Sequence, residues 1–281
     1  MAQTDGSGPA AGPSGGRNLP LAVGSAVLFA VLFLGSAFVS KWALLSFIAL
    51  AIVIAVLEVD VALRTTAARP PTAVVLVAGL AMLAGAFVYG AMGQLTALIV
   101  MVLAVLAWSL ADRSDPAPLQ SAGSGLLIGM WVPFLASFLA LLLRRPDGQW
   151  YVILTVLLTA ASDIFAYGVG YQFGRHKLAP AVSPGKTWEG VVGGMLGAML
   201  VAAIAGPLMI DRLSVGRAVA LGALVAIVSV IGDLAESAVK RSLGVKDLGR
   251  LLPGHGGMMD RVDAMLFTLP VAHLVLLAGR L

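Results

Sequence analysis

The chain has 281 residues, of which 59% are hydrophobic and only 11% are charged. A soluble globular domain carries about a quarter charged residues, so this composition excludes that class and indicates a protein with many membrane spans. The formal net charge of +4 needs no nucleic-acid partner, because basic loops on one side of a membrane explain it.

The predicted elements begin with a tail, residues 1–19, which is rich in Gly, Pro, Ala and Ser and is expected to be disordered and cytoplasmic. Apolar runs long enough to cross a bilayer follow as far as the C-terminus. A break at Gly90 to Gln94 divides the longest of them into two helices. The nine spans expected are about 20–39, 42–60, 73–90, 94–111, 120–143, 149–170, 190–210, 216–233 and 262–280. The prediction is an all-α polytopic membrane protein, with residues 20–281 forming one integral membrane domain.

The basic residues indicate how this domain is oriented. The loops on the N-terminal side of the predicted spans hold twelve Lys and Arg residues, whereas the loops on the other side hold six. Cytoplasmic loops are enriched in Lys and Arg. We therefore expect the N-terminus and the two most polar loops to face the cytoplasm.

Two stretches interrupt the apolar pattern, residues 162–190 and 231–264. Asp163 and Asp233 each close an apolar span at the start of one stretch. An ionisable group at membrane depth usually faces the interior of the helix bundle or a wet cavity. The alternative is that each acid simply lies at the membrane surface, at the end of a helix.

Beyond Asp233 the helix is expected to continue past the membrane. Asp233, Glu236, Ser237, Lys240 and Gly244 recur at offsets of 0, 3, 4, 7 and 11 and therefore share one helical face. A solvated helix with weak side-chain pairs would show the same spacing. Spacing alone therefore does not decide between these two interpretations.

Asp260 and Asp263 stand three residues apart at the start of the last span, where carboxylates are favourable for a helix. Carboxylates from two helices are a usual way to hold Mg²⁺ for a phosphate substrate. Gly254, Gly256 and Gly257 would let backbone amides approach an anion. The nearby bases Lys240, Arg241, Lys246, Arg250 and Arg261 match the charge of a polyphosphate. This combination predicts phosphoryl or nucleotidyl transfer.

The first stretch contains "SPGKTWEG", in which Ser183, Lys186 and Thr187 can donate hydrogen bonds to a phosphate. A P-loop is excluded, because Pro180 stands where that motif needs glycine and the loop is expected to follow an apolar helix rather than a strand. Thr187 is also a good cap for the next helix. His255, in the glycine loop, can be a phosphate donor, a general acid or a structural residue of the loop.

The stretch "SAVKRSLGVKDLGRLLPGHGGMMDRVD", Ser237 to Asp263, resembles the signature of phosphatidate cytidylyltransferases. The residues at the family's spacing are Ser237, Lys240, Arg241, Lys246, Asp247, Gly249, Pro253, His255, Gly256, Gly257, Asp260, Arg261 and Asp263. "DIFAYGVGYQFGRHKLAPAVSPGKTWEG" is similar to the family's second motif. The specific resemblance covers about residues 160–267, where we expect the catalytic elements.

This resemblance implies that CTP and phosphatidic acid give CDP-diacylglycerol and pyrophosphate, with Mg²⁺ alone or with a second ion such as K⁺. It also implies nine helices around a polar cavity open to the cytoplasm, in a homodimer in the cell membrane. Asp233 and Asp260 would bind the metal, and Asp263 and Glu236 would complete its shell. The expected catalytic and substrate-binding residues are Lys240, Arg261, His255, Ser183, Lys186, Thr187, Arg241, Lys246, Asp247, Gly256, Gly257, Ser237 and Asp163.

Two alternatives remain. Another metal-dependent transferase of CDP-lipids would need its own spaced aspartate motif, which the sequence lacks. A membrane transporter would spread polar residues over the bilayer midplane and repeat them in both halves. Here the polar residues gather in two loops of the C-terminal half, which favours the enzyme.

Overall fold

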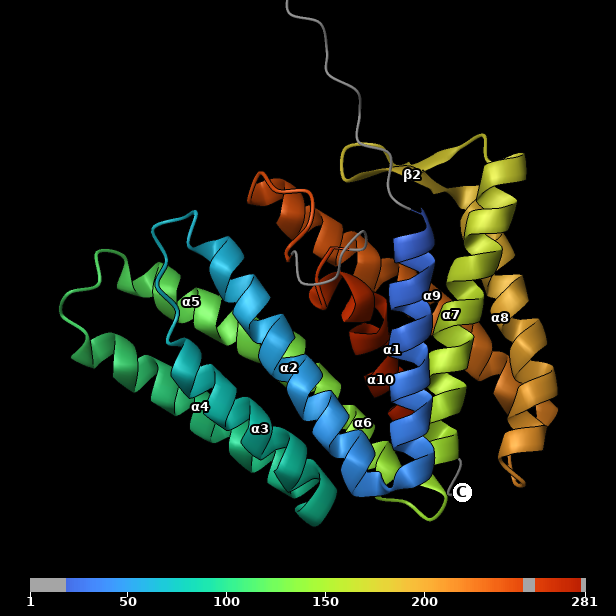
Figure 1. Ribbon diagram of the computed structural model, residues 1–281, viewed down its shortest axis with the longest axis horizontal. Coiled ribbons are helices and arrows are strands. Elements are labelled where there is room, and N and C mark those ends of the chain that lie inside the picture. The colour runs from blue at the N-terminus through green and yellow to red at the C-terminus, as the bar shows by residue number, and fades with distance from the viewer. Residues whose placement is uncertain (1–18, 250–255, 279–281) are drawn as a thin grey trace, which may run out of the picture.

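The computed structural model describes residues 19–249 and 256–278 as a bundle of long helices with one small β-hairpin (Figure 1). The predicted tail falls outside the described residues up to position 18, and Leu19 is already helical. The helices are α1 Leu19–Val39, α2 Lys41–Leu63, α3 Thr72–Tyr89, α4 Ala91–Ala111, α5 Pro118–Gly129, α6 Leu135–Leu143, α7 Gly148–Phe173, α8 Trp188–Met209, α9 Val215–Ser242 and α10 Met259–Ala278.

Seven helical segments among the described residues are long and apolar enough to cross a membrane. They are α2, α3, α4, the continuous segment Pro118–Leu143, α7, α8 and α9. In Pro118–Leu143 a π-helical turn, Met130–Phe134, joins α5 to α6 around Pro133, because a proline cannot donate the backbone hydrogen bond of a regular helix. An integral membrane protein that is almost wholly helical is thereby confirmed. Membrane crossing by α1 and α10, and hence the count of nine, remains a prediction.

Local sequence signals explain where several helices begin and end. The Ser40 hydroxyl accepts the Ala43 amide at 3.0 Å and caps α2. Gly90 has φ of 71° between α3 and α4, a conformation that glycine adopts without steric cost. The break predicted at Gly90 to Gln94 is present but confined to Gly90, since α4 already begins at Ala91.

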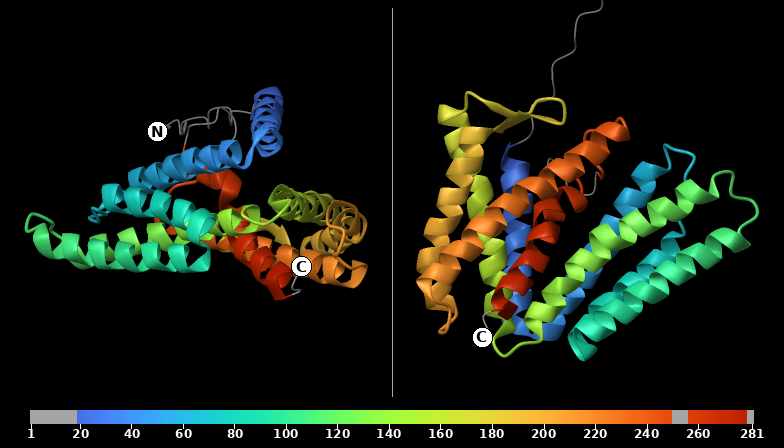
Figure 2. Two further views of the ribbon diagram at one scale, coloured as in Figure 1. Left: turned by 90° about the horizontal axis from the view of Figure 1, so that it is seen from below. Right: turned by 180° about the vertical axis from the view of Figure 1, so that it is seen from behind.

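The helices of the C-terminal half pack closely, and α8 lies between α7 and α9. Small residues on α8 make this possible. A Cβ atom at Gly193 would meet Val169, one at Gly194 would meet the backbone of Ser162, and one at Gly197 would meet the ring of Phe165. Glycines allow such close helix contacts where lipid provides no hydrophobic driving force. In Figures 1 and 2, α7 and α8 occupy one side of the molecule, α3, α4 and α5 the other, and α10 lies between.

A short antiparallel hairpin, β1 Lys177–Ala179 and β2 Ser183–Thr187, connects α7 to α8. Lys177 pairs with Thr187 and Ala179 with Ser183. From the sequence only a basic loop was expected here, because these strands lack the alternating apolar pattern of a sheet. Contacts at the hairpin base explain the difference: the His176 carbonyl accepts the Trp188 amide at 2.9 Å, and the Glu189 carboxylate contacts the His176 ring at 2.6 Å.

The helices that carry Asp163 and Asp233 extend beyond the predicted span ends, to Phe173 in α7 and to Ser242 in α9. The continuation of α9 past Asp233 was expected, whereas that of α7 from its predicted end at 170 to 173 is a small extension. Gly244 has φ of 68° and lies beyond the end of α9. It therefore does not extend the helical face that begins at Asp233.

Candidate functional site

A polar pocket of ≈ 1050 Å³ lies among α7, the hairpin, α9 and the start of α10. Both polar stretches of the sequence line this pocket, although residues 191–230, most of α8 and the first half of α9, separate them along the chain. The predicted site residues that line it are Asp163, Ser183, Lys186, Thr187, Asp233, Glu236, Lys240, Asp247, Asp260, Arg261 and Asp263. The tertiary structure therefore gathers most of the predicted set in one place.

Three carboxylates form a cluster in this pocket: Asp233 and Glu236 from α9 and Asp263 from α10. One oxygen from each lies within 4.8 Å of the others. Glu236 is 1% exposed, and its Oε1 atom has no hydrogen-bond partner among the described residues. A buried carboxylate is costly unless a cation or hydrogen bonds compensate for it. Three converging carboxylate oxygens with one unpartnered buried atom fit a hard cation such as Mg²⁺.

Lys240 connects this cluster to Asp260. Its ammonium lies 2.5 Å from Oε2 of Glu236 and 2.9 Å from Oδ1 of Asp260. The other oxygen of Asp260 accepts the Gly257 amide at 2.8 Å. Of the four predicted metal ligands, three therefore lie together, whereas Asp260 lies outside that cluster, paired with Lys240.

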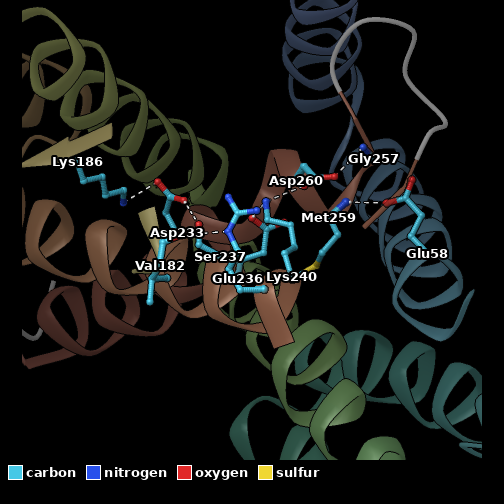
Figure 3. Close-up of polar contacts among 11 residues, drawn as sticks. Glu58, Val182, Lys186, Asp233, Glu236, Ser237, Lys240, Gly257, Met259 and Asp260 are labelled. Atoms are coloured by element: carbon cyan, nitrogen blue, oxygen red, sulfur yellow. Dashed lines mark hydrogen bonds and ion pairs between the residues drawn. The ribbon is translucent and has the colours of Figure 1, made fainter. Parts of the chain in front are cut away.

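Lys186, from the hairpin, contacts the cluster on the side opposite to Lys240. Its ammonium lies 2.6 Å from Oδ2 of Asp233 (Figure 3). It also lies 3.5 Å from the carbonyl oxygen of Val230. The Lys186 side chain is 20% exposed and that of Asp233 is 41% exposed, so the lysine is the better shielded partner of this ion pair. The pocket thus holds two lysine ammonium groups within contact distance of its carboxylates.

The other predicted substrate-binding residues occupy several kinds of position. Ser237 donates to Asp233 at 3.5 Å, and Asp163 accepts from Ser229 at 3.2 Å. Arg241 donates to the Val182 carbonyl oxygen at 3.4 Å, in the hairpin turn. Arg241, Ser237 and the exposed Lys246 do not line the pocket.

Thr187 is almost fully buried, and its hydroxyl oxygen accepts the Gly190 amide at 3.1 Å. It therefore caps α8, which the sequence analysis considered beside a phosphate-binding role. Thr187 also lines the pocket.

The glycine loop is described from position 256 onwards, so His255 and Gly254 lie outside the described residues. Gly256 has φ of 79°, and a Cβ atom there would meet the carboxylates of Asp260 and Asp247. Glycine is required at this position both by the backbone conformation and by the available space.

Four residues with polar side chains at or beside the site were not predicted from the sequence. Tyr167, Tyr171 and Lys177 line the pocket, and Glu58 accepts the Met259 amide at 2.9 Å from the distant helix α2. Glu58 is an acid at the end of an apolar span, the same signal that identified Asp163 and Asp233. It was missed because it forms no recognisable motif with Asp60 and Arg64, the charged residues that follow it.

Comparison with known proteins places the whole helical region in one family. The sequence model of the cytidylyltransferase family matches residues 21–278. A phosphatidate cytidylyltransferase of Mycobacterium bovis is 35% identical over 245 residues, which are 82% of this chain and 78% of that protein. One of Thermotoga maritima is 38% identical over 184 residues, 63% of this chain and 68% of that protein. The chain belongs to the cytidylyltransferase family.

Proposed function

We propose that this protein transfers the cytidylyl group of CTP to phosphatidic acid, giving CDP-diacylglycerol and pyrophosphate. The main support is a cluster of charged side chains. In a chain of the cytidylyltransferase family, three carboxylates and two lysines converge in a single pocket at the polar end of a membrane-embedded bundle. We infer the substrate pair from the relatives named phosphatidate cytidylyltransferase.

In this reaction a phosphate oxygen of phosphatidic acid attacks the α-phosphorus of CTP. A new oxygen–phosphorus bond forms as the bond from the α-phosphorus to the bridging oxygen breaks, and pyrophosphate leaves with that electron pair. The attacking phosphate monoester is already anionic near neutral pH, since its second pKa is about 6. The protein therefore needs no strong general base, and its main tasks are to position the substrates and to balance their charge.

Asp233, Glu236 and Asp263 would hold Mg²⁺, since their oxygens converge and Oε1 of Glu236 has no other partner among the described residues. When bound, the ion would neutralise phosphate charge and make the phosphorus more electrophilic. Asp260, a metal ligand by resemblance, contacts Lys240 and is proposed to orient that ammonium. A second ion such as K⁺ remains part of the proposal.

The basic groups would bind the phosphates. Lys240 and Arg261 line the pocket from α9 and α10, and Lys186 and Ser183 line it from the hairpin. Ammonium and guanidinium groups form strong charge-assisted hydrogen bonds to phosphate oxygens. We assign Lys240 and Arg261 to the triphosphate and the pyrophosphate leaving group, and Lys186 and Ser183 to the lipid phosphate or the nucleotide.

The position of the pocket suits two substrates of opposite solubility. The hairpin and the end of α9 lie at one end of the bundle in Figure 1, and α10 begins further into it. Phosphatidic acid can reach this end from the bilayer and CTP from water. The excess of Lys and Arg in the loops on this side supports a cytoplasmic orientation in the cell membrane. The nine spans, the cytoplasmic tail and a homodimer belong to the same proposal.

The test uses purified protein, phosphatidic acid, labelled CTP and Mg²⁺. The wild type should form CDP-diacylglycerol, Asp260→Asn should lose most of this activity, and Asp115→Asn, in a distant loop, should keep it. An inert wild type would overturn the proposed function, and full activity of Asp260→Asn would overturn the assigned site.

A further inference from the structure

Glu58 belongs to α2, in the half of the chain that the recognised motifs do not reach. Its Oε2 atom accepts the backbone amide of Met259 at 2.9 Å (Figure 3). Met259 is the first residue of α10, and the first amides of a helix have no acceptor within the helix. Glu58 therefore caps α10 from a different helix of the bundle.

A second carboxylate also accepts a backbone amide beside this helix start. Asp260 accepts the Gly257 amide at 2.8 Å with one oxygen and the Lys240 ammonium at 2.9 Å with the other. Met259 immediately precedes Asp260 along the chain. A shift of Met259 would therefore move Asp260 relative to Lys240, and Asp263 relative to the other acids of the cluster.

Two glycines make room for Glu58. The three nearest atoms to a Cβ placed at Gly249 all belong to the Glu58 side chain, and the same holds at Gly257. The carboxylate therefore lies directly against the backbone on both sides of residues 250–255. A side chain at either glycine would displace Glu58.

The end of α2 that carries Glu58 is itself anchored. Asp60 is buried and accepts the Thr72 hydroxyl at 2.6 Å, at the start of α3, while its other oxygen pairs with Arg64 at 2.9 Å. This end of α2, which carries Glu58, is therefore held in place against α3.

We propose that Glu58 is a positioning residue of the active site. It holds the start of α10 so that Asp260 forms its ion pair with Lys240. The same contact places the Asp263 carboxylate beside those of Asp233 and Glu236. Glu58 does not line the pocket, so it acts through the Met259 amide and not on substrate. The inference rests on the proposed function, and it gives the N-terminal helices a part in building the site.

The first experiment compares Glu58→Ala, Glu58→Gln and Leu57→Ala in the purified full-length protein. Leu57 is the neighbouring, partly exposed residue of α2 and serves as the matched control. Glu58→Ala should lower kcat by roughly tenfold to a hundredfold, as small misplacements of reacting groups do. It should also raise the Mg²⁺ concentration needed for half-maximal activity. Glu58→Gln keeps an acceptor oxygen for Met259 and should stay within about threefold of wild type, as should Leu57→Ala.

The second experiment uses the close approach of the Glu58 side chain to Gly249. Gly249→Ala should impair activity because its new Cβ atom meets Glu58, and Glu58→Ala should relieve that clash. The double variant Glu58→Ala/Gly249→Ala should therefore be no worse than Glu58→Ala alone. If the activity losses of the two single variants multiply in the double variant, the two residues act independently and the proposal is contradicted. An unchanged kcat in Glu58→Ala would also contradict it.

A third measurement does not depend on the reaction. Mg²⁺ should raise the Tm of the wild type and of Glu58→Gln, and should raise the Tm of Glu58→Ala distinctly less at the same concentration. If the wild type responds to Mg²⁺ but forms no CDP-diacylglycerol, the proposed function fails while the positioning role is still measured. An equal rise in Tm for all three proteins would overturn the positioning role itself.

Discussion

The Lys186 ammonium lies 2.6 Å from the Asp233 carboxylate. This contact joins the β-hairpin to α9 and links the two polar stretches of the sequence. Asp233 also belongs to the acid cluster, so one carboxylate faces both a lysine of the hairpin and the proposed cation position. The hairpin is therefore part of the site and not merely a connection between helices.

Replacing Lys186 by Met should lower activity by roughly a hundredfold, the usual cost of removing one preorganised charge at a reacting phosphate. Lys186→Arg should keep part of the activity, because it keeps the charge. The measurement is kcat/KM for CTP and for phosphatidic acid separately, and the substrate whose KM rises identifies the phosphate that Lys186 binds. Arg212→Met, at an exposed position in the loop between α8 and α9, is the control. Wild-type kinetics in Lys186→Met would contradict the assigned role.

Substitution of a cluster acid should abolish Mg²⁺ binding, whereas substitution of Asp260 should not. Asp263→Asn and Glu236→Gln remove a cluster carboxylate, so both activity and the Mg²⁺-induced rise in Tm should be lost. Asp260→Asn leaves the cluster intact, so activity should fall while most of the Mg²⁺-induced rise in Tm remains. Thermal unfolding with and without Mg²⁺ tests this. Loss of the Mg²⁺ response in Asp260→Asn would show instead that Asp260 is a ligand, as the resemblance implies.

Thr187→Ala should destabilise the protein, because the start of α8 would lose the acceptor of the Gly190 amide. Loss of such a cap costs about 1 kcal/mol, and the hydroxyl is buried here. Thr187→Ser keeps the acceptor and should retain a Tm close to that of wild type. If Thr187→Ala keeps its Tm but loses activity, the hydroxyl acts on substrate instead.

Gly197→Leu should disrupt the packing of α8 on α7, since even a Cβ atom at this position overlaps the Phe165 ring. Overpacking a close contact costs about 1–3 kcal/mol. The expected result is a lower Tm and a lower yield of folded protein. Leu196→Ala, which changes the adjacent exposed residue, should leave both nearly unchanged. A wild-type Tm in Gly197→Leu would show that the two helices separate more easily than this packing implies.

Most of the helices could be predicted from the sequence, because each depends on a run of apolar residues long enough to cross a bilayer. The hairpin could not be predicted, since its strands show no alternating pattern. The contacts of His176 with Trp188 and Glu189 hold its base. The site residues of α9 and α10 were identified from local spacing, whereas Glu58 was not, because its partner lies 201 positions along the chain.

By itself, the sequence determined the membrane class, the two polar stretches and the shared helical face of Asp233, Glu236 and Lys240. These features depend on hydrophobicity and on helical periodicity, which are local. Only the tertiary structure decided that Asp263 joins the acid cluster while Asp260 pairs with Lys240. Distances between side chains on different helices depend on how the helices are rotated and packed, and the spacing of residues within one helix does not encode this.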